Sequence, residues 1–271
     1  MPQAQAFNPL VLVKFVLWLA LVAVATVLLA RRKMTARLRL YFIVGGVLLF
    51  GVGFGLLLYP GLNPNPPSSL RTLLTSLLVR GNVVPAVAGM LVVLLLVSWI
   101  SNKSICGYGC QLGLLQDLLH RVPLSKWQPP FWLSNSVRIV AFVGLLGGLA
   151  LAGLDWIGVV DPFRLFQFDL TLPIAATVGL IVAASLFVYR PWCRFLCPFG
   201  LVSWGVEQVS VYRPRIDRDA CKGCQLCVKA CPSGAMADFY ADNQLHADCF
   251  ACGACIDACP VNDVLNWRRK D

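Results

Sequence analysis

The chain has 271 residues, of which 58% are hydrophobic and 13% are charged, whereas soluble domains carry about 25% charged residues. This composition excludes an ordinary soluble domain and indicates a membrane protein with a modest soluble part. Residues 1–220 carry 18 Lys and Arg against 7 Asp and Glu, a net charge of +11, while residues 221–271 carry 5 against 6. The basic residues therefore lie beside the apolar segments, where they indicate membrane lipid and orientation rather than nucleic acid.

Five apolar segments follow one another along the chain as expected transmembrane helices. The first, Leu10–Ala30, is interrupted only by Lys14, and the basic residues directly after it argue against a cleaved signal peptide. The others are residues 40–58, 83–100, 137–154 and 173–189. Between them, the sequence predicts loops at 59–82 and 155–172 and a short amphipathic helix at 112–120.

An internal repeat relates two parts of this apolar region. A shift of 87 residues places Cys106 on Cys193, Cys110 on Cys197 and Gly113 on Gly200. We therefore expect two copies of one unit, related by an axis along the membrane normal. The expected organisation is an N-terminal helix and basic loop (1–39), a first membrane repeat (40–136), a second (137–215) and a C-terminal domain (216–271).

Each repeat contains a C-x3-C motif whose chemistry has three interpretations. On a helix, the i, i+4 spacing puts both sulfur atoms on one face, and the repeat brings the two pairs towards one axis. The four cysteines could be redox dithiols, could hold a metal ion or a further iron-sulfur cluster, or could be structural thiols in a helical core. The spacing alone leaves these alternatives open.

The strongest motif is C-x2-C-x2-C-x3-C-P, which occurs twice after residue 220. Disulfides and four-cysteine zinc sites are the alternatives, but neither requires a third cysteine at this spacing followed by Cys-Pro. The pattern is typical of a ferredoxin with two 4Fe-4S clusters, in which the fourth ligand of each cluster comes from the other motif. The expected ligands are Cys221, Cys224, Cys227 and Cys259 for cluster 1, and Cys249, Cys252, Cys255 and Cys231 for cluster 2.

Two C-x3-C motifs followed by two ferredoxin motifs resemble the NapH-type membrane ferredoxins, which are quinol dehydrogenase subunits, and the related modules of the NosR and MauN kind. The resemblance begins near Leu40. Cys193, Cys197 and Pro198 match its second signature, whereas Gln111 stands where the first usually has Pro. It implies an all-α polytopic membrane bundle with a C-terminal α+β ferredoxin domain.

The same resemblance implies that the protein oxidises membrane quinol and passes electrons through 4Fe-4S clusters to a partner redox protein, as one subunit of a membrane complex. Two alternatives are the reverse flow, in which a soluble reductant drives quinone reduction, and a non-catalytic module for anchoring, maturation or regulation. Haem is not expected, because a b-type haem needs His ligands inside the spans and the two histidines, His120 and His246, lie outside them.

A quinone headgroup needs hydrogen-bond partners beside apolar walls, so polar and aromatic residues at the membrane boundary are the candidates for its site. The preferred candidates follow the second C-x3-C motif, with Glu207 as a proton acceptor beside Trp192, Arg194, Trp204 and Gln208. The other candidate is the loop around Asp155, Trp156, Asp161, Pro162, Phe163 and Arg164.

The distribution of basic residues predicts the orientation. Five lie in residues 31–39, and others follow the third and fifth spans, on the side of both C-x3-C motifs. The positive-inside rule then places the N-terminus outside and the ferredoxin domain in the cytoplasm of a bacterial inner membrane.

Overall fold

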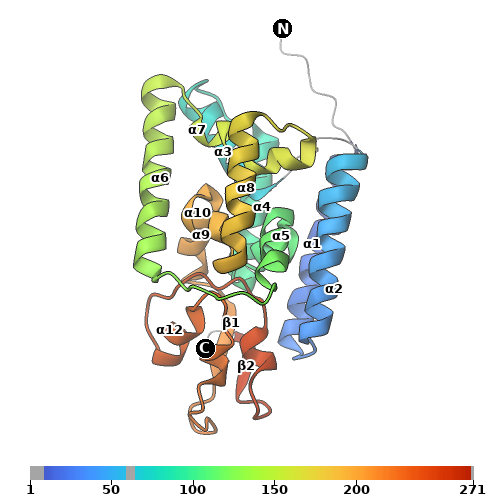
Figure 1. Ribbon diagram of the computed structural model, residues 1–271, viewed down its shortest axis with the longest axis vertical. Coiled ribbons are helices and arrows are strands. Elements are labelled where there is room, and N and C mark those ends of the chain that lie inside the picture. The colour runs from blue at the N-terminus through green and yellow to red at the C-terminus, as the bar shows by residue number, and fades with distance from the viewer. Residues whose placement is uncertain (1–8, 59–64, 270–271) are drawn as a thin grey trace.

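The computed structural model describes residues 9–58 and 65–269. It is mostly helical, with a helical bundle joined at one end to a small C-terminal part that contains two strands (Figure 1). Helices α1 (Pro9–Ala30) and α2 (Ala36–Gly46), which continues as a π-helix through Val47–Leu57, form one side of the bundle. Helix α6 (Phe131–Ala152) forms the other side, and α4 (Pro85–Ser101) and α8 (Leu172–Phe187) lie between them.

In the described part of the chain, three helical segments are long and apolar enough to cross a membrane: Leu10–Ala30, Ala36–Leu57 and Phe131–Ala152. Helices α4 and α8 are also apolar but have 17 and 16 residues, so the expected count of five spans is not established. The outward faces suit lipid, because large apolar side chains point away from the protein: Val140 is 70% exposed and Leu151 is 91% exposed.

The prediction of a loop at 59–82 was wrong for most of its length. Residues 59–64 lie outside the described residues, but Pro66–Leu78 is helix α3. The side chain of Asn65 accepts a hydrogen bond from the backbone N–H of Ser68 at 2.9 Å, and the two prolines that suggested a loop occupy the first helical turn. The expected loop at 155–172 likewise contains α7 (Trp156–Val159) and a 3-10 helix at Pro162–Gln167.

Short helices follow each C-x3-C motif and fill the centre of the bundle end. In the first repeat, a π-helical turn at Ile105–Gly109 leads into α5 (Gln111–His120). In the second, α9 (Pro191–Phe195) leads into α10 (Pro198–Glu207). The second cysteine of each motif is therefore the residue that begins an interfacial helix, and the two motifs do not form continuous helices.

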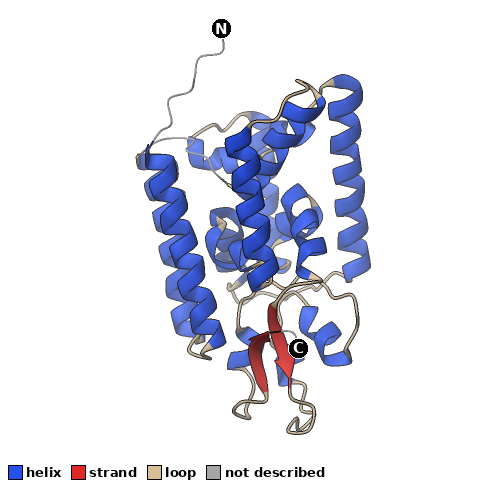
Figure 2. Cartoon of the chain, turned by 180° about the vertical axis from the view of Figure 1, so that it is seen from behind, coloured by secondary structure: helices blue, strands red, loops and turns tan. Residues whose placement is uncertain are grey.

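The C-terminal part has the α+β composition expected of a ferredoxin-type region (Figure 2). Strand β1 (Tyr212–Ile216) pairs antiparallel with β2 (Leu265–Arg269), with Pro214 opposite Trp267. The short helices α11 (Leu226–Lys229), α12 (Ala235–Ala241) and α13 (Ala254–Asp257) lie between the strands in sequence. The loop at residues 246–253 faces the bundle, since Asn102 and Tyr108 donate hydrogen bonds to the carbonyl oxygens of Cys249 and Cys252.

Candidate functional site

The eight ferredoxin cysteines line two separate cavities. The first, which we call the Cys221 cavity, is lined by Cys221, Cys224, Cys227 and Cys259. The second, the Cys231 cavity, is lined by Cys231, Cys249, Cys252 and Cys255. These are the two sets predicted from the spacing, including the exchange of the fourth cysteine between motifs. All twelve cysteines lie in the described part of the chain, and none of them forms a disulfide.

Both cavities fit a 4Fe-4S cluster by the chemistry of their walls. Each cavity is lined by four cysteine side chains, the number of thiolates that a 4Fe-4S cluster takes. The loops approach closely because Gly223 and Gly253 adopt left-handed backbone angles (φ 69° and 77°). The backbone N–H of Met236 donates to Sγ of Cys231 at 3.4 Å, which is the kind of bond that tunes a cluster.

The two cavities differ in their exposure to solvent. Cys231 and Cys255 are buried against the bundle, whereas Cys224 is exposed. The Cys231 cavity also borders the membrane part directly, because Tyr189, two residues after the last apolar helix α8, forms part of its wall. The Cys231 cavity therefore lies beside the bundle, and the Cys221 cavity lies nearer the protein surface.

The four cysteines of the C-x3-C motifs, which we call the bundle cysteines, are Cys106, Cys110, Cys193 and Cys197. The structure gathers all four: each is between 6% and 8% exposed, and the electrostatic influence of the first pair reaches the second. Burial raises the pKa of all four thiols. Sγ of Cys197 accepts the backbone N–H of Gly200 at 3.3 Å, and Sγ of Cys193 accepts from Nε2 of Gln116 at 3.6 Å.

The matching glycines of the repeat have a packing role. A Cβ atom on Gly200 would lie 2.6 Å from the carbonyl oxygen of Cys193, and one on Gly113 would lie 3.1 Å from that of Cys106. In both repeats the interfacial helix therefore packs against the backbone of the preceding cysteine. This contact explains why glycine recurs at the same repeat position.

The repeat also contains a pair of basic residues that the sequence analysis missed. Lys103 and Arg190 are 87 positions apart, three residues before the first cysteine of each motif, and both have left-handed backbone angles (φ 65° and 50°). Each reaches across to the other repeat: Nζ of Lys103 donates to the carbonyl oxygen of Gly200 at 3.1 Å, and Nη1 of Arg190 donates to that of Cys106 at 2.5 Å. The 87-residue shift that relates the two C-x3-C motifs also places Lys103 on Arg190, and this match is the sequence signal that identifies them.

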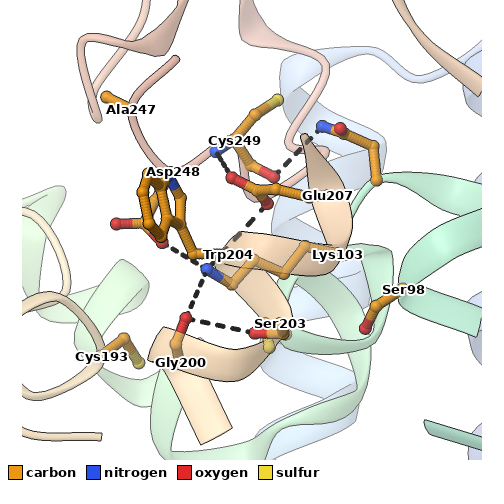
Figure 3. Close-up of polar contacts among 12 residues, drawn as sticks. Ser98, Lys103, Cys193, Gly200, Ser203, Trp204, Glu207, Ala247, Asp248 and Cys249 are labelled. Atoms are coloured by element: carbon orange, nitrogen blue, oxygen red, sulfur yellow. Dashed lines mark hydrogen bonds and ion pairs between the residues drawn. The ribbon is translucent and has the colours of Figure 1, made fainter. Parts of the chain in front are cut away.

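Each of these basic residues pairs with a buried carboxylate. Arg190 lies 2.9 Å from Asp117 in the first repeat. Lys103 pairs with Asp248, the residue before Cys249 (Figure 3). Nη1 of Arg138 lies 3.0 Å from the same carboxylate. The pairs of Lys103 and Arg138 with Asp248 attach the ferredoxin loop to the bundle, whereas the Arg190–Asp117 pair joins the two repeats within the bundle.

Glu207 lies in the same cluster (Figure 3). Its Oε1 accepts the backbone N–H of Cys249 at 3.1 Å, and its Oε2 is 3.9 Å from Nζ of Lys103. Burial raises the pKa of Glu207 well above its usual range, although Lys103 opposes the shift. The carboxyl group thus lies beside a backbone amide of the loop expected to hold cluster 2.

The other predicted quinone residues are packed into this joint. Trp192 and Arg194 are each 2% exposed. Trp204 donates to the carbonyl oxygen of His246 at 2.9 Å, and the side chain of Gln208 accepts from the backbone N–H of His246 at 3.0 Å. Trp204 and Gln208 therefore hold the loop at His246, whereas Arg194 donates to the carbonyl oxygen of Pro129 and the backbone N–H of Trp192 donates to Gln116.

In the second candidate loop, the two acids are paired with one arginine. Nε of Arg71 lies 2.7 Å from Asp155, and its Nη1 lies 2.5 Å from Asp161. Arg164 pairs with Asp169 at 3.1 Å. The ion pairs of Arg71 therefore attach this loop to α3, and the Arg164–Asp169 pair joins two residues of the loop.

Comparison with known proteins supports the iron-sulfur assignment. Residues 213–260 match a family described as a 4Fe-4S dicluster domain. Residues 83–130 and 170–215, which contain the bundle cysteines, each match a 4Fe-4S binding domain. No solved structure matches the chain.

Three relatives are named as an electron transport protein, a ferredoxin-type protein and a regulatory protein. The chain is 25% identical over 166 residues to YccM of Escherichia coli, a suggested electron transport protein, a match that covers 55% of this chain and 46% of YccM. It is 29% identical over 157 residues to the methylamine utilization ferredoxin-type protein MauN of Paracoccus denitrificans (55% and 54%). It is 29% identical over 167 residues to the regulatory protein NosR of Pseudomonas aeruginosa (53% and 21%).

The matches thus span about half of YccM and MauN and a fifth of NosR. Together with the apolar helices and the cysteine cavities, they support electron transport by a membrane protein that carries ferredoxin-type 4Fe-4S domains.

Proposed function

We propose that the protein oxidises membrane quinol and delivers the electrons through two 4Fe-4S clusters to a partner redox protein, in the manner of the NapH-type subunits. The observation that carries the proposal is the direct contact of the Cys231 cavity with the membrane part through Tyr189. Each cluster, when bound, takes up and releases one electron. The chain supplies the thiolates, the hydrogen bonds to sulfur and the separation of the clusters from water.

The partner is proposed to dock at the Cys221 cavity. Cys224 is exposed there, so a second redox protein can approach this cluster more closely than the one beside the bundle. Following the distribution of basic residues, the bundle cysteines and the ferredoxin domain are proposed to face the cytoplasm of a bacterial inner membrane, with five spans if α4 and α8 also cross.

The four bundle cysteines are proposed to hold a further metal centre with a net negative charge, and an additional iron-sulfur cluster is the one we favour. Burial of unbalanced charge is costly, yet basic side chains outnumber acidic ones at this end of the bundle even if Glu207 is counted as charged. The basic residues there, each at most 8% exposed, are Arg39, Lys103, Arg138, Arg190 and Arg194. The acidic residues, each at most 3% exposed, are Asp117, Glu207 and Asp248. Neutral dithiols would leave the excess uncompensated, whereas four thiolates around a metal centre would balance it.

Anaerobic reduction by a quinol tests the main proposal. Menadiol added to the purified, cluster-loaded protein should bleach the cluster absorbance and produce the EPR signal of the reduced clusters, and dithionite gives the maximal signal. A spectrum unchanged by menadiol, both alone and with the isolated partner complex, would rule out quinol oxidation. Reduction of added menadione by the dithionite-reduced protein, without the forward reaction, would instead support the reverse flow.

A further inference from the structure

A larger pocket lies beside the Cys231 cavity, between the bundle and the ferredoxin part. Its volume is about 370 Å³, within the range that holds a small cofactor or a quinone headgroup. It shares three wall residues with the Cys231 cavity: Tyr189, Cys252 and Gly253. Any molecule bound in the pocket would therefore touch the same loop that is expected to hold cluster 2.

The pocket has apolar walls and a polar end. Ala254 and Ala258 of the ferredoxin part and Met34 of the bundle contribute apolar surface, while His120 and Arg121 at the end of α5 contribute polar groups. This combination suits an aromatic ring that carries oxygen atoms at two ends.

Lipid-facing side chains lie next to the pocket in sequence. Arg39, which lines the pocket, is followed by Leu40 and Tyr41 on α2, which are 37% and 71% exposed. Because α2 continues into one of the candidate spans, an isoprenoid tail could follow this helix into the bilayer while the headgroup stays in the pocket.

The imidazole ring of His120 lines the pocket. Its Nδ1 lies 3.2 Å from the carbonyl oxygen of Ser185, and a carbonyl can only accept, so Nδ1 carries the proton. Nε2 of the neutral ring is then unprotonated. The ring packs edge-on against Tyr189 with centroids 5.4 Å apart, and Tyr189 packs in the same way against Phe250 at 5.8 Å. An aromatic series thus runs from the pocket to the loop of cluster 2.

Asp117 positions the basic groups around the pocket. Its carboxylate accepts from Nη2 of Arg39 at 2.5 Å and from the hydroxyl group of Tyr189 at 2.8 Å. Arg121 is held loosely, with Nε 3.8 Å from Asp117 and its side chain 32% exposed. The guanidinium group of Arg121 is therefore available to donate to a ring oxygen.

We propose that this pocket binds the quinol headgroup, with Nε2 of His120 accepting a hydroxyl proton and Arg121 donating to the opposite oxygen. The inference rests on the proposed quinol oxidation and moves its site away from Trp192, Arg194, Trp204, Glu207 and Gln208. Oxidation of one quinol breaks two O–H bonds and releases two electrons, one to each 4Fe-4S cluster. One proton goes to His120 and the other to water at the open side of the pocket.

The experiment uses two pocket variants and one control in the full-length, cluster-loaded protein. His120→Gln removes the proton acceptor, and Ala36→Trp fills the mouth from an exposed position of α2 that lines the pocket. Lys229→Gln is the control, because Lys229 is exposed on α11, next to Ala230 of the pocket wall, but does not line the pocket. We expect both pocket variants to slow reduction by menadiol at least about tenfold, with full reduction by dithionite.

Photolabelling with an azido-quinone provides a readout that does not depend on electron transfer. We expect the label on peptides from 111–121 and 252–258, with less label in Ala36→Trp. Two results would contradict quinol binding in this pocket and leave quinol oxidation intact. One is label confined to the loop at 155–164. The other is reduction of the pocket variants by menadiol as fast as that of the unmodified protein. Label in the pocket without any reduction by menadiol would overturn quinol oxidation and leave the binding site intact.

Discussion

The buried ion pairs of Asp248 predict how firmly the ferredoxin loop is held on the bundle. Asp248 is 1% exposed and pairs with Lys103 and with Arg138, whose Nη1 is 3.0 Å away. Asp248→Ala would leave two buried cations without their carboxylate, and breaking a buried pair costs about 3–5 kcal/mol. If that cost falls on the joint, about 3 kcal/mol corresponds to a roughly 150-fold rise in the population of the open loop.

Hydrogen exchange of the Cys249 amide measures this opening, because its N–H donates to Oε1 of Glu207 within the joint. The matched control is Asp263→Asn, which breaks an exposed ion pair between the same two parts: Asp263 lies 3.5 Å from Arg32 and its side chain is 83% exposed. That pair is worth about 0–1 kcal/mol, so exchange should rise less than about fivefold. Equal exchange in the two variants would refute the reasoning.

The stability that the Asp248 ion pairs contribute depends on pH. Burial alone would favour the protonated acid, but Lys103 and Arg138 outweigh it and lower the pKa of Asp248 to about 2. Stability from a lowered carboxyl pKa is present above the unfolded value of about 3.9 and is lost as the pH falls through about 2. The difference between Asp248→Ala and the unmodified protein should therefore be constant from pH 5 to 8.

Three further predictions concern the bundle cysteines, the repeat and the pocket. Replacement of all four bundle cysteines by Ala should lower iron and sulfide by about one third, from three clusters to two, and unchanged content would exclude a cluster there. Gly200→Ala should destabilise the cluster-loaded protein by about 1–3 kcal/mol in thermal unfolding, whereas Gly205→Ala on the same helix, with nothing within 4 Å, should not; equal effects would contradict the packing argument. Burial and Lys126 lower the pKa of His120, so quinol-driven reduction should decline as the pH falls through a value below 6.5. This limb should vanish in His120→Gln; its persistence there would refute its assignment to His120, although Asp117, Arg121, Tyr189, Arg39 and Asp257 also face the pocket.

The cysteine spacing predicted the walls of both ferredoxin cavities, because a cubane that takes three ligands from a short run and one from a distant Cys-Pro leaves a regular pattern in sequence. The repeat predicted that the bundle cysteines meet. It did not predict Asp248 opposite Lys103, because these residues are 145 positions apart and their pairing depends on how two parts dock. Trp204 and Gln208 were assigned to a quinone site because aromatic and amide side chains serve a ligand pocket and a domain joint equally well.

Some helices could be predicted from the sequence and others could not. The apolar segments were found because lipid selects composition over a long window. Helix α3 was missed because Pro66 and Pro67 normally interrupt a helix, and only the cap at Asn65 shows that they begin one. From the sequence, His120 was placed only outside the spans, because its partner, the carbonyl oxygen of Ser185, belongs to the other repeat.

The buried cations beside the Cys231 cavity bear on the direction of electron flow. Nζ of Lys103 lies 5.2 Å from the ring centroid of Phe250, which lines that cavity. A positive charge near a cluster stabilises its reduced form and raises its reduction potential towards that of a quinone pool, which favours uptake of electrons from quinol. At about 10 Å and an effective dielectric constant of about 20, one charge contributes about 1.7 kcal/mol, or about 70 mV for a one-electron couple.

Lys103→Met should therefore lower the potential of one of the two ferredoxin clusters by tens of millivolts and leave the other nearly unchanged. Redox titration followed by EPR measures both potentials, and Lys229→Gln serves as the control, since an exposed charge is screened by solvent. The rate of reduction by menadiol should fall with the potential, while the dithionite-reduced signal stays the same. A shift of both clusters together, or of neither, would show that Lys103 does not act on the cluster beside the bundle, and the charge argument for electron entry at that end would fail.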